Sequence, residues 1–359
     1  MPVIVVDDDK VLRFVHALLD PEAPPARTAA LSEFLSFDIP HVEAWIERVR
    51  ASSGALFPAT VRMVPDQEAL SQALADADAL VVEGLAVGEA ELERAPRLRL
   101  VHKFGIDTRN IDLDACARAG VPVRTTRRAV NGAVAEHAIA LMMAVGRKIC
   151  ATDGALDFES LRALGYKPGM YDPDHISGAN WARVSGLKSL LGATLGALGL
   201  GEVGREVAIR ARAMGMEVLY HQRNRLTPEI EAESDARYVP FDELLERADF
   251  LSVHLPYTPE TEGMVDSRAF DRVKPGAILV NVSRAPIVER AALIAALDCG
   301  RLGGAGLDVH YQEPGAPDEA LKAYANVVLT PHIAVASRRH AVADMEAVVA
   351  SLAQCCADG

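Results

Sequence analysis

The chain has 359 residues, half of them hydrophobic, and a formal net charge of −13 at pH 7. This length and apolar content suit two domains, and the acidic balance argues against a nucleic-acid-binding protein, which concentrates Lys and Arg. The amino terminus lacks the basic start and long apolar segment of a signal peptide, so we expect a cytoplasmic protein with no membrane partner. Five cysteines without CxxC spacing predict neither a metal site nor disulfides.

Short apolar segments alternate with helical ones along the chain, which predicts parallel sheets built from β-α-β units. The first series of strands is expected at 3–6, 61–64, 79–82, 98–102 and 121–124, followed by a long helix at 132–147. Within this series, residues 21–53 are expected to form one or two peripheral surface helices. A second series of strands is expected at 194–198, 217–221, 250–253, 277–281, 304–308 and 327–329.

The order of these elements predicts two domains, the first of them discontinuous. The last helix, at 337–357, has no strand left to follow and is expected to fold back on the first series. We therefore assign residues 1–152 plus 335–359 to a substrate (catalytic) domain, and residues 153–334 to a dinucleotide-binding domain. The latter includes a crossover segment at 153–192, which contains Gly, Pro and Asp with little periodicity.

The stretch Gly199-Leu200-Gly201-Glu202-Val203-Gly204 lies between a predicted strand and a predicted helix. In a dinucleotide site, the first glycine permits a tight turn and the second lets the backbone approach the pyrophosphate. The third glycine lets the helix pack against the strand. A glycine-rich turn without a ligand is the alternative, but the strand, helix and second strand around this motif favour the dinucleotide.

Three side chains that could perform chemistry follow the ends of later strands. Arg284 could bind a carboxylate through its planar fork, and His332 could transfer a proton near neutral pH. Glu313 could favour the protonated form of a nearby imidazole. Alone, each could equally be a surface charge, a turn residue or a loop imidazole; together they suit the reduction of a carbonyl by a nicotinamide cofactor.

These motifs resemble those of the D-isomer-specific 2-hydroxyacid dehydrogenases over about residues 80–336. The matching segments are Asn110-Ile111-Asp112, Ala135-Glu136-His137-Ala138, the glycine motif, His254-Leu255-Pro256, Val280 to Arg284, Gly306-Leu307-Asp308-Val309 with Glu313-Pro314, and Thr330-Pro331-His332. The resemblance implies an α/β fold of two Rossmann-like doubly wound parallel-sheet domains with a cleft between them. It also implies a homodimer formed through the cofactor domain. Arg284 would anchor the substrate, His332 would be the general acid/base, and Glu313 would orient it.

The cofactor pocket is expected to draw on loops at several strand ends. Its predicted residues are Gly199, Gly201, Glu202, Val203, Gly204, Gln222, Arg223, His254, Leu255, Pro256, Val282, Ser283, Arg284, Asp308 and His332. An acid at the end of the second strand would bind the adenosine ribose and disfavour a 2′-phosphate. This chain instead has His221-Gln222-Arg223-Asn224-Arg225 there, so we predict that NADP is preferred and NAD is possible.

Two loops depart from the family pattern at positions that could recognise groups on the substrate. We expect Lys103, Gly105, Ile106 and Asp107 to join Arg284 in binding a small-molecule substrate. Asp107 stands where relatives have glycine. It either pairs with Lys103 or Arg109, which we favour, or recognises a cationic or hydroxyl group. Arg127 and Arg128 are either a solvated pair or a site for a second acidic group.

The activity predicted on this basis is reduction of a small 2-keto acid to a D-2-hydroxy acid, similar to that of glyoxylate or hydroxypyruvate reductases. Formate dehydrogenases share the fold but do not need a His–Glu pair. A phosphite-type dehydrogenase is an alternative because those enzymes carry a lysine near the position of Lys103. A non-catalytic dinucleotide-sensing scaffold resembling the C-terminal binding protein corepressors is another, although the complete Arg, Glu and His set favours catalysis.

Overall fold

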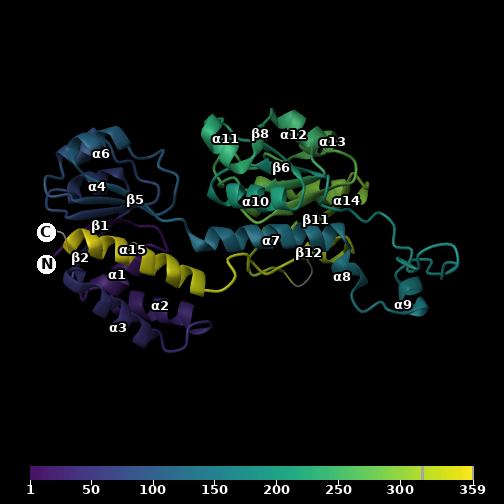
Figure 1. Cartoon of the computed structure of the whole chain (residues 1–359), viewed down its shortest axis with the longest axis horizontal. Helices are drawn as coiled ribbons and strands as arrows, with labels where there is room; N and C mark the ends of the chain where they lie inside the picture. Colours follow the sequence, from purple (N-terminus) through teal and green to yellow (C-terminus); the bar gives the residue numbers. More distant parts are fainter. Residues whose placement is uncertain (317–318, 358–359) are drawn as a thin grey trace. The chain divides into compact units, whose positions relative to one another are not determined.

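The computed structural model describes residues 1–316 and 319–357, with side chains up to Cys355 in the last helix. It divides into two compact units, Met1–Ala133 with Val335–Gly359, and Val134–Ala334. The first division falls inside helix α7 (Ala129–Gly146), whereas the sequence suggested a boundary after residue 152. Most of α7 lies along β11 (Leu302–Leu307) and β12 (Val327–Leu329) of the second unit (Figure 1). Because α7 is apolar all round, its pattern does not reveal which core it joins.

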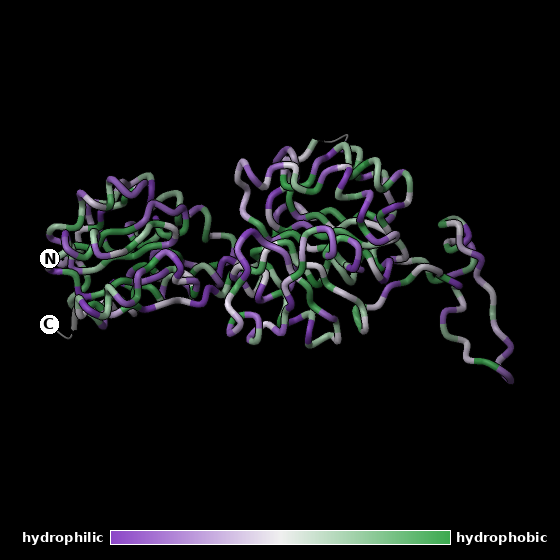
Figure 2. The backbone as a smooth tube through the Cα atoms, turned by 90° about the horizontal axis from the view of Figure 1, so that it is seen from above, coloured by the Kyte–Doolittle hydropathy of each residue, from purple (hydrophilic) through white to green (hydrophobic). Residues whose placement is uncertain are grey.

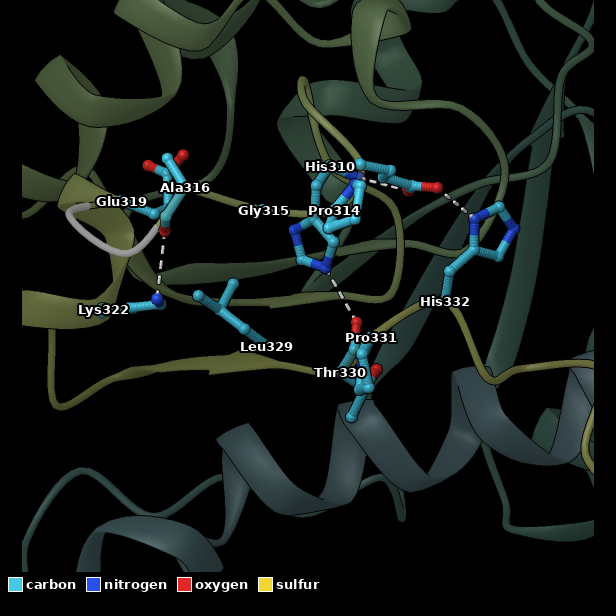
Figure 3. A pocket seen from close by; sticks show the side chains of 11 residues that line it. His310, Pro314, Gly315, Ala316, Glu319, Lys322, Leu329, Thr330, Pro331 and His332 are labelled. Carbon is cyan, nitrogen blue, oxygen red and sulfur yellow. Dashed lines mark hydrogen bonds and ion pairs between the residues drawn. The ribbon is translucent and has the colours of Figure 1, made fainter.

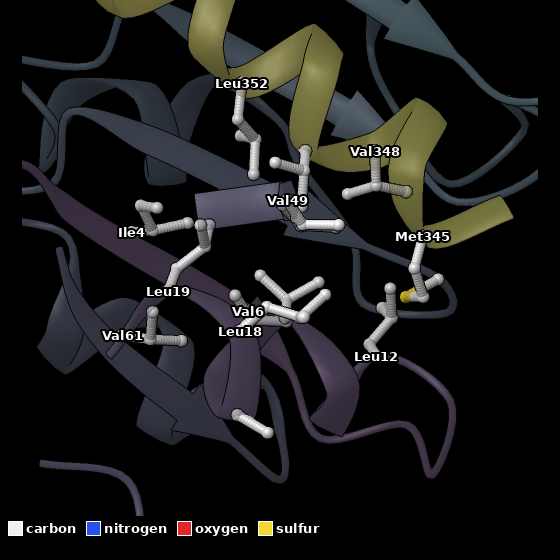
Figure 4. Packing of buried hydrophobic residues seen from close by; sticks show 14 of the residues in the cluster. Ile4, Val6, Leu12, Leu18, Leu19, Val49, Val61, Met345, Val348 and Leu352 are labelled. Atoms are coloured by element: carbon white, nitrogen blue, oxygen red, sulfur yellow. The ribbon is translucent and has the colours of Figure 1, made fainter. Parts of the chain in front are cut away.

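The first unit is built on a five-stranded parallel sheet in the order β2-β1-β3-β4-β5. Side chains alternate between the two faces of the sheet. Ile4 and Val6 face the core that α15 (Arg339–Ala357) completes, while Val5 faces the opposite core with Leu70. Figure 4 shows the first of these cores, with side chains from β1, α1 (Arg13–Leu19), α3 (Val42–Ser52) and α15 packed together. The strands are β1 (Val3–Asp7), β2 (Thr60–Val64), β3 (Ala79–Val82), β4 (Leu100–Lys103) and β5 (Val123–Thr125).

Helices cover both faces of this sheet. One core includes residues of α1 (Arg13–Leu19), α2 (Pro25–Ser36), α3 (Val42–Ser52) and α15 (Arg339–Ala357). The other includes residues of α4 (Gln67–Ala73) and α6 (Leu113–Ala119), with α5 (Glu89–Glu93) beside α6. The last helix thus packs on the first series of strands, as its lack of a following strand predicted.

The segment 21–53 forms two helices, α2 and α3, but the expectation that they are peripheral is wrong. Trp45 is only 1% exposed and its indole N–H donates a 2.8 Å hydrogen bond to Glu346 of α15. Leu31 and Leu35 are buried in the same core. The apolar residues of α2 and α3 therefore pack against a helix far along the chain, with Trp45 and Glu346 301 residues apart, and local periodicity does not reveal this partner.

The second unit contains a seven-stranded parallel sheet in the order β12-β11-β10-β9-β6-β7-β8. The predicted limits of five of these strands coincide with the observed ones, and the three-residue strand β8 was not predicted. The tube in Figure 2 is mostly hydrophobic, drawn in green, in the interior of each unit. The strands are β6 (Thr194–Leu198), β7 (Glu217–His221), β8 (Ala236–Tyr238), β9 (Phe250–Val253), β10 (Ala277–Asn281), β11 (Leu302–Leu307) and β12 (Val327–Leu329).

The helices of this unit alternate with its strands. They are α10 (Glu202–Ala213), α11 (Pro228–Ser234), α12 (Phe241–Arg247), α13 (Ser267–Arg272) and α14 (Arg290–Asp298). Helix α7 is the one described helix long and apolar enough to cross a membrane, and 56% of it is buried inside the protein, as expected of a core helix. The four cysteines whose side chains are described are free thiols; the side chain of Cys356 lies outside the described residues.

The segment between α7 and β6, residues 147–193, forms an arm with little regular structure. It contains the short helices α8 (Ile149–Thr152) and α9 (Phe158–Ala163). Large apolar side chains along the arm are exposed, among them Leu156 at 81%, Met170 at 67% and Leu191 at 76%.

Candidate active site

The predicted residues of the second unit gather at one edge of its sheet. Strands β6, β9, β10, β11 and β12 are parallel and adjacent, so the loops that follow them leave the sheet on the same side. These loops carry the glycine motif, His254, Arg284, Glu313 and His332, respectively. The carboxyl edge of an open parallel sheet is where α/β proteins bind ligands.

Each glycine of the motif meets a different constraint. Gly199 has a left-handed φ of +92°, which other residues rarely adopt. A Cβ on Gly204 would lie 2.4 Å from the carbonyl oxygen of Gly199, so only glycine allows α10 to pack this closely. A Cβ on Gly201 would meet no atom within 4 Å, which leaves its backbone open to a ligand. Glu202 and Val203 follow as the first residues of α10, whose start has no side-chain cap.

The loop after β7 carries two arginines, Arg223 and Arg225, and the structure shows which of them is paired within the protein. Arg225 makes two hydrogen bonds of 2.9 and 2.8 Å to Glu231. This contact lowers the pKa of Glu231 against the opposing effect of its burial, and raises the pKa of Arg225. Arg223 is exposed. Gln222 accepts a 2.9 Å bond from the amide of Leu200, so it supports the glycine loop.

His254 lies beside the glycine motif with neither ring nitrogen hydrogen-bonded to any described residue, although both are buried. Burial lowers its pKa to about 4, so the imidazole is neutral at pH 7. Buried polar groups are normally paired. An unpartnered imidazole on a residue that approaches Gly199 and Gly204 of the motif therefore fits a bound dinucleotide, which would offer oxygen and nitrogen partners.

The loop after β10 presents Arg284. Asn281, at the end of that strand, accepts a 3.0 Å bond from the amide of Ser283 and donates one of 3.0 Å to the carbonyl of Arg284. The Ser283 hydroxyl donates a hydrogen bond to the carbonyl of Leu255, and this bond joins the loop after β10 to the His254-Leu255-Pro256 loop. Val282 is buried, and Arg284 is exposed. Asn281 was not predicted as a site residue, although its polar side chain at the end of an apolar strand was a signal.

His332 and Glu313 meet as a pair. Nδ1 of His332 lies 2.7 Å from Oε2 of Glu313, and the other carboxylate oxygen accepts a 3.0 Å bond from the amide of His310 (Figure 3). Partial burial would raise the pKa of Glu313, but these hydrogen bonds outweigh it and lower the pKa below its usual value. A pocket of about 650 Å³ adjoins the pair, and its lining includes Leu329 and Thr330. The pair can therefore hold a proton at the edge of an open space.

Asp308, predicted to line the cofactor pocket, is fully buried. Its carboxylate accepts hydrogen bonds from the Thr330 hydroxyl at 2.6 Å and from the amides of Ile333 and Ala334 at 2.9 and 2.8 Å. The carboxylate thus holds the loop that carries His332. This support was not predicted, because it depends on contacts between segments separated in the sequence.

The predicted substrate residues of the first unit lie at the end of β4 and in the loop after it, at the carboxyl edge of its own sheet. Asp107 accepts hydrogen bonds of 2.8 and 2.9 Å from Nε of Arg109, as the favoured interpretation predicted. The ammonium of Lys103 donates to the carbonyl of Glu83. Arg128 lies 5.0 Å from the ring centre of Phe104. Gly105, with a φ of +135°, and Ile106 complete this loop.

Burial raises the pKa of Glu83 although Arg128 and Lys103 oppose the shift, which gives this edge a carboxyl group beside two cations. Arg128 approaches the Glu83 carboxylate to 3.9 Å, so this arginine is not simply a solvated charge. Within residues 1–316 and 319–357, no three His, Cys, Asp or Glu side chains form a group that could hold a metal ion.

Comparison with known proteins agrees with this geometry. Residues 170–334 match the family model described as D-isomer specific 2-hydroxyacid dehydrogenase, NAD binding domain. A glyoxylate reductase of Thermococcus litoralis is 37% identical over 276 residues, which are 76% of this chain and 78% of that protein. A glyoxylate reductase from Paecilomyes thermophila has a similar structure, with a TM-score of 0.55 and 26% identity over 98% of this chain and 93% of that one.

A D-3-phosphoglycerate dehydrogenase of Mycobacterium tuberculosis is 38% identical over 270 residues, 75% of this chain. The aligned region is 47% of that relative, so the chain spans about half the length of the phosphoglycerate dehydrogenases that it matches. The match to an NAD-binding domain agrees with a nicotinamide dinucleotide as the cofactor.

Proposed function

Since this chain belongs to the D-isomer-specific 2-hydroxyacid dehydrogenase family, we propose that it reduces a small 2-keto acid to the D-2-hydroxy acid with a nicotinamide dinucleotide. The observation that carries the proposal is the 2.7 Å contact of His332 with Glu313 at the sheet edge that also bears the glycine motif and Arg284. An acid/base pair, an exposed guanidinium and a dinucleotide loop are the parts that this reaction needs.

Each side chain has a role in this reaction. When bound, the nicotinamide supplies the hydride. Arg284 binds the carboxylate of the keto acid and polarises the neighbouring carbonyl through its planar fork. His332 gives a proton to the carbonyl oxygen as an alcohol forms, and the Glu313 carboxylate stabilises the protonated imidazole and fixes its orientation.

NADPH is the proposed preferred cofactor, with NADH as a weaker one. No acidic residue lies between His221 and Arg225 to repel a 2′-phosphate. Because Glu231 already pairs with Arg225, the exposed Arg223 is the cation proposed to contact the phosphate. Glyoxylate and hydroxypyruvate are the proposed substrates, a choice supported by relatives named glyoxylate reductase.

A homodimer is the proposed assembly. The arm at residues 147–193 exposes Leu156, Met170 and Leu191, and exposed apolar side chains grouped in one segment are typical of an interface. A second copy of the chain would cover them. Light scattering of the purified protein tests this proposal: a dimer mass supports it, and a monomer at micromolar concentration contradicts it.

The activity is tested by following NADPH oxidation with glyoxylate, hydroxypyruvate, pyruvate, phenylpyruvate and oxaloacetate. We expect turnover of at least one of the first two, with a D product, and a fall of about 100-fold or more in kcat/KM for Arg284→Ala. Turnover of phosphite with NADP instead would indicate a phosphite-type dehydrogenase. NADPH binding without any turnover would indicate a scaffold.

A further inference from the structure

His137 on α7 contacts the loop that carries His332. Its Nε2 atom lies 2.9 Å from the hydroxyl oxygen of Thr330 and 3.4 Å from the carboxylate of Asp308. The Thr330 hydroxyl donates a 2.6 Å hydrogen bond to the same carboxylate. A threonine hydroxyl has one proton, so the bond between His137 and Thr330 needs a proton from Nε2. His137 therefore donates to Thr330, and Thr330 donates to Asp308.

Asp308 extends this chain of bonds to the residues that follow His332. Its two carboxylate oxygens accept the amide protons of Ile333 and Ala334, at 2.9 and 2.8 Å. His332 itself has a φ of +55°, a left-handed conformation that is unfavourable for a residue with a side chain. A backbone of this kind persists only when its surroundings hold it. The bonds to Asp308 are such a restraint.

The chain passes between the two units at points next to this network. One crossing, between Ala133 and Val134, lies on α7 about one helical turn before His137. The other lies between Ala334 and Val335, directly after the amide that Asp308 accepts. The buried Asp308 carboxylate is thus connected through Thr330 to His137 on α7, the helix that carries the first crossing. It is also bonded directly to Ala334, which precedes the second crossing.

We infer that His137 is a positioning residue for the acid/base group, because it holds His332 in place through Thr330 and Asp308. The segments at both chain crossings are thereby connected to the side chain that transfers the proton. This inference rests on the proposed function. His137 acts through other residues, since its contact is with Thr330 and Asp308 while His332 pairs with Glu313. The His310 ring lies 2.8 Å from the Thr330 carbonyl oxygen and adds a second restraint on the same loop.

The test uses paired variants of the full-length protein. His137→Leu and Thr330→Val remove the donors, whereas His137→Gln and Thr330→Ser keep a donor at the same position. Glu136→Gln is the matched control, because Glu136 is the neighbouring residue of α7, 71% exposed and only loosely paired. Two quantities are measured: kcat with hydroxypyruvate at saturating NADPH, and amide hydrogen exchange of the peptide that contains Ile333 and Ala334.

The apolar variants are expected to lower kcat about 10- to 100-fold, with the KM for NADPH within about threefold of wild type. The peptide is expected to exchange faster in both variants. His137→Gln, Thr330→Ser and Glu136→Gln should stay near the wild-type values. If His137→Leu leaves kcat and exchange unchanged, or if His137→Gln is as impaired as His137→Leu, the inference is wrong. An inactive wild type would instead count against the proposed function, and the exchange result would still decide whether His137 restrains the loop.

Discussion

The carboxylate of Glu313 lies 2.7 Å from Nδ1 of His332, and its other oxygen accepts the amide of His310, so the imidazole and the carboxylate face each other in a fixed orientation. These bonds lower the pKa of Glu313. The carboxylate is therefore ionised throughout the neutral range, where it favours a protonated imidazole. The bond at Nδ1 leaves Nε2 of His332 to meet a substrate oxygen.

Replacing Glu313 by Gln should alter both the rate and its dependence on pH. Without the negative charge, the imidazole gives up its proton more readily, so keto-acid reduction should fail at a lower pH than in the wild type. We expect kcat to fall between about 10- and 1,000-fold at pH 7.5. Profiles of kcat/KM against pH for both proteins provide the measurement, and superimposable alkaline limbs would show that Glu313 does not act on the proton donor.

Replacing Arg223 by Ala should weaken NADPH but not NADH. A charge-assisted contact with the 2′-phosphate corresponds to about a 10- to 100-fold change in the KM for NADPH. Arg225→Ala is the matched control, because Arg225 is paired with Glu231, and it should lower the melting temperature while the preference stays within about threefold. A KM for NADPH that is equal in Arg223→Ala and the wild type would remove this arginine from cofactor recognition.

Two glycine substitutions should separate cofactor binding from folding. Alanine at Gly201 meets open space, so Gly201→Ala should keep the wild-type melting temperature yet raise the KM of the cofactor at least about 10-fold, because its methyl group occupies the place of a phosphate. Alanine at Gly204 would lie 2.4 Å from the Gly199 carbonyl oxygen, so Gly204→Ala should unfold at a lower temperature. Unchanged cofactor binding by the folded Gly201→Ala protein would argue against the glycine motif as the phosphate site.

His102 should make the first unit sensitive to acid. Its ring lies 2.9 Å from the hydroxyls of Ser351 and Thr126, and burial lowers its pKa to about 4. The unfolded chain, with an ordinary histidine pKa of about 6.5, binds the proton first. Stability is therefore complete above about pH 6.5 and falls as the pH drops toward 4, by about 2 kcal/mol between pH 7 and pH 5.

Urea unfolding at pH 7 and pH 5 measures this loss. The loss between the two pH values should be about 2 kcal/mol smaller in His102→Asn than in the wild type. His254, whose pKa is also lowered to about 4, contributes equally to both proteins and cancels from the comparison. An equal loss in the two proteins would rule out His102 as the cause.

The strands other than β8 could be predicted from sequence because each is a short apolar run bounded by turns, and β6, β7, β9, β10 and β12 have their predicted limits. Arg284, Glu313 and His332 could be proposed because parallel strands bring their carboxyl ends to one edge. What could not be predicted depends on distant partners. The packing of Trp45 against α15 and the bond of His137 to Thr330 leave no local pattern in the sequence.

Replacing His332 by Gln shows whether this side chain is the proton donor, because glutamine keeps the size and polarity of the side chain but transfers no proton at neutral pH. NADPH oxidation with glyoxylate or hydroxypyruvate should be measured at saturating cofactor for both proteins, together with the dissociation constant of NADPH. We expect a rate at least about 100-fold lower in the variant, with NADPH binding within about threefold of wild type. Equal rates in the two proteins would contradict this role of His332.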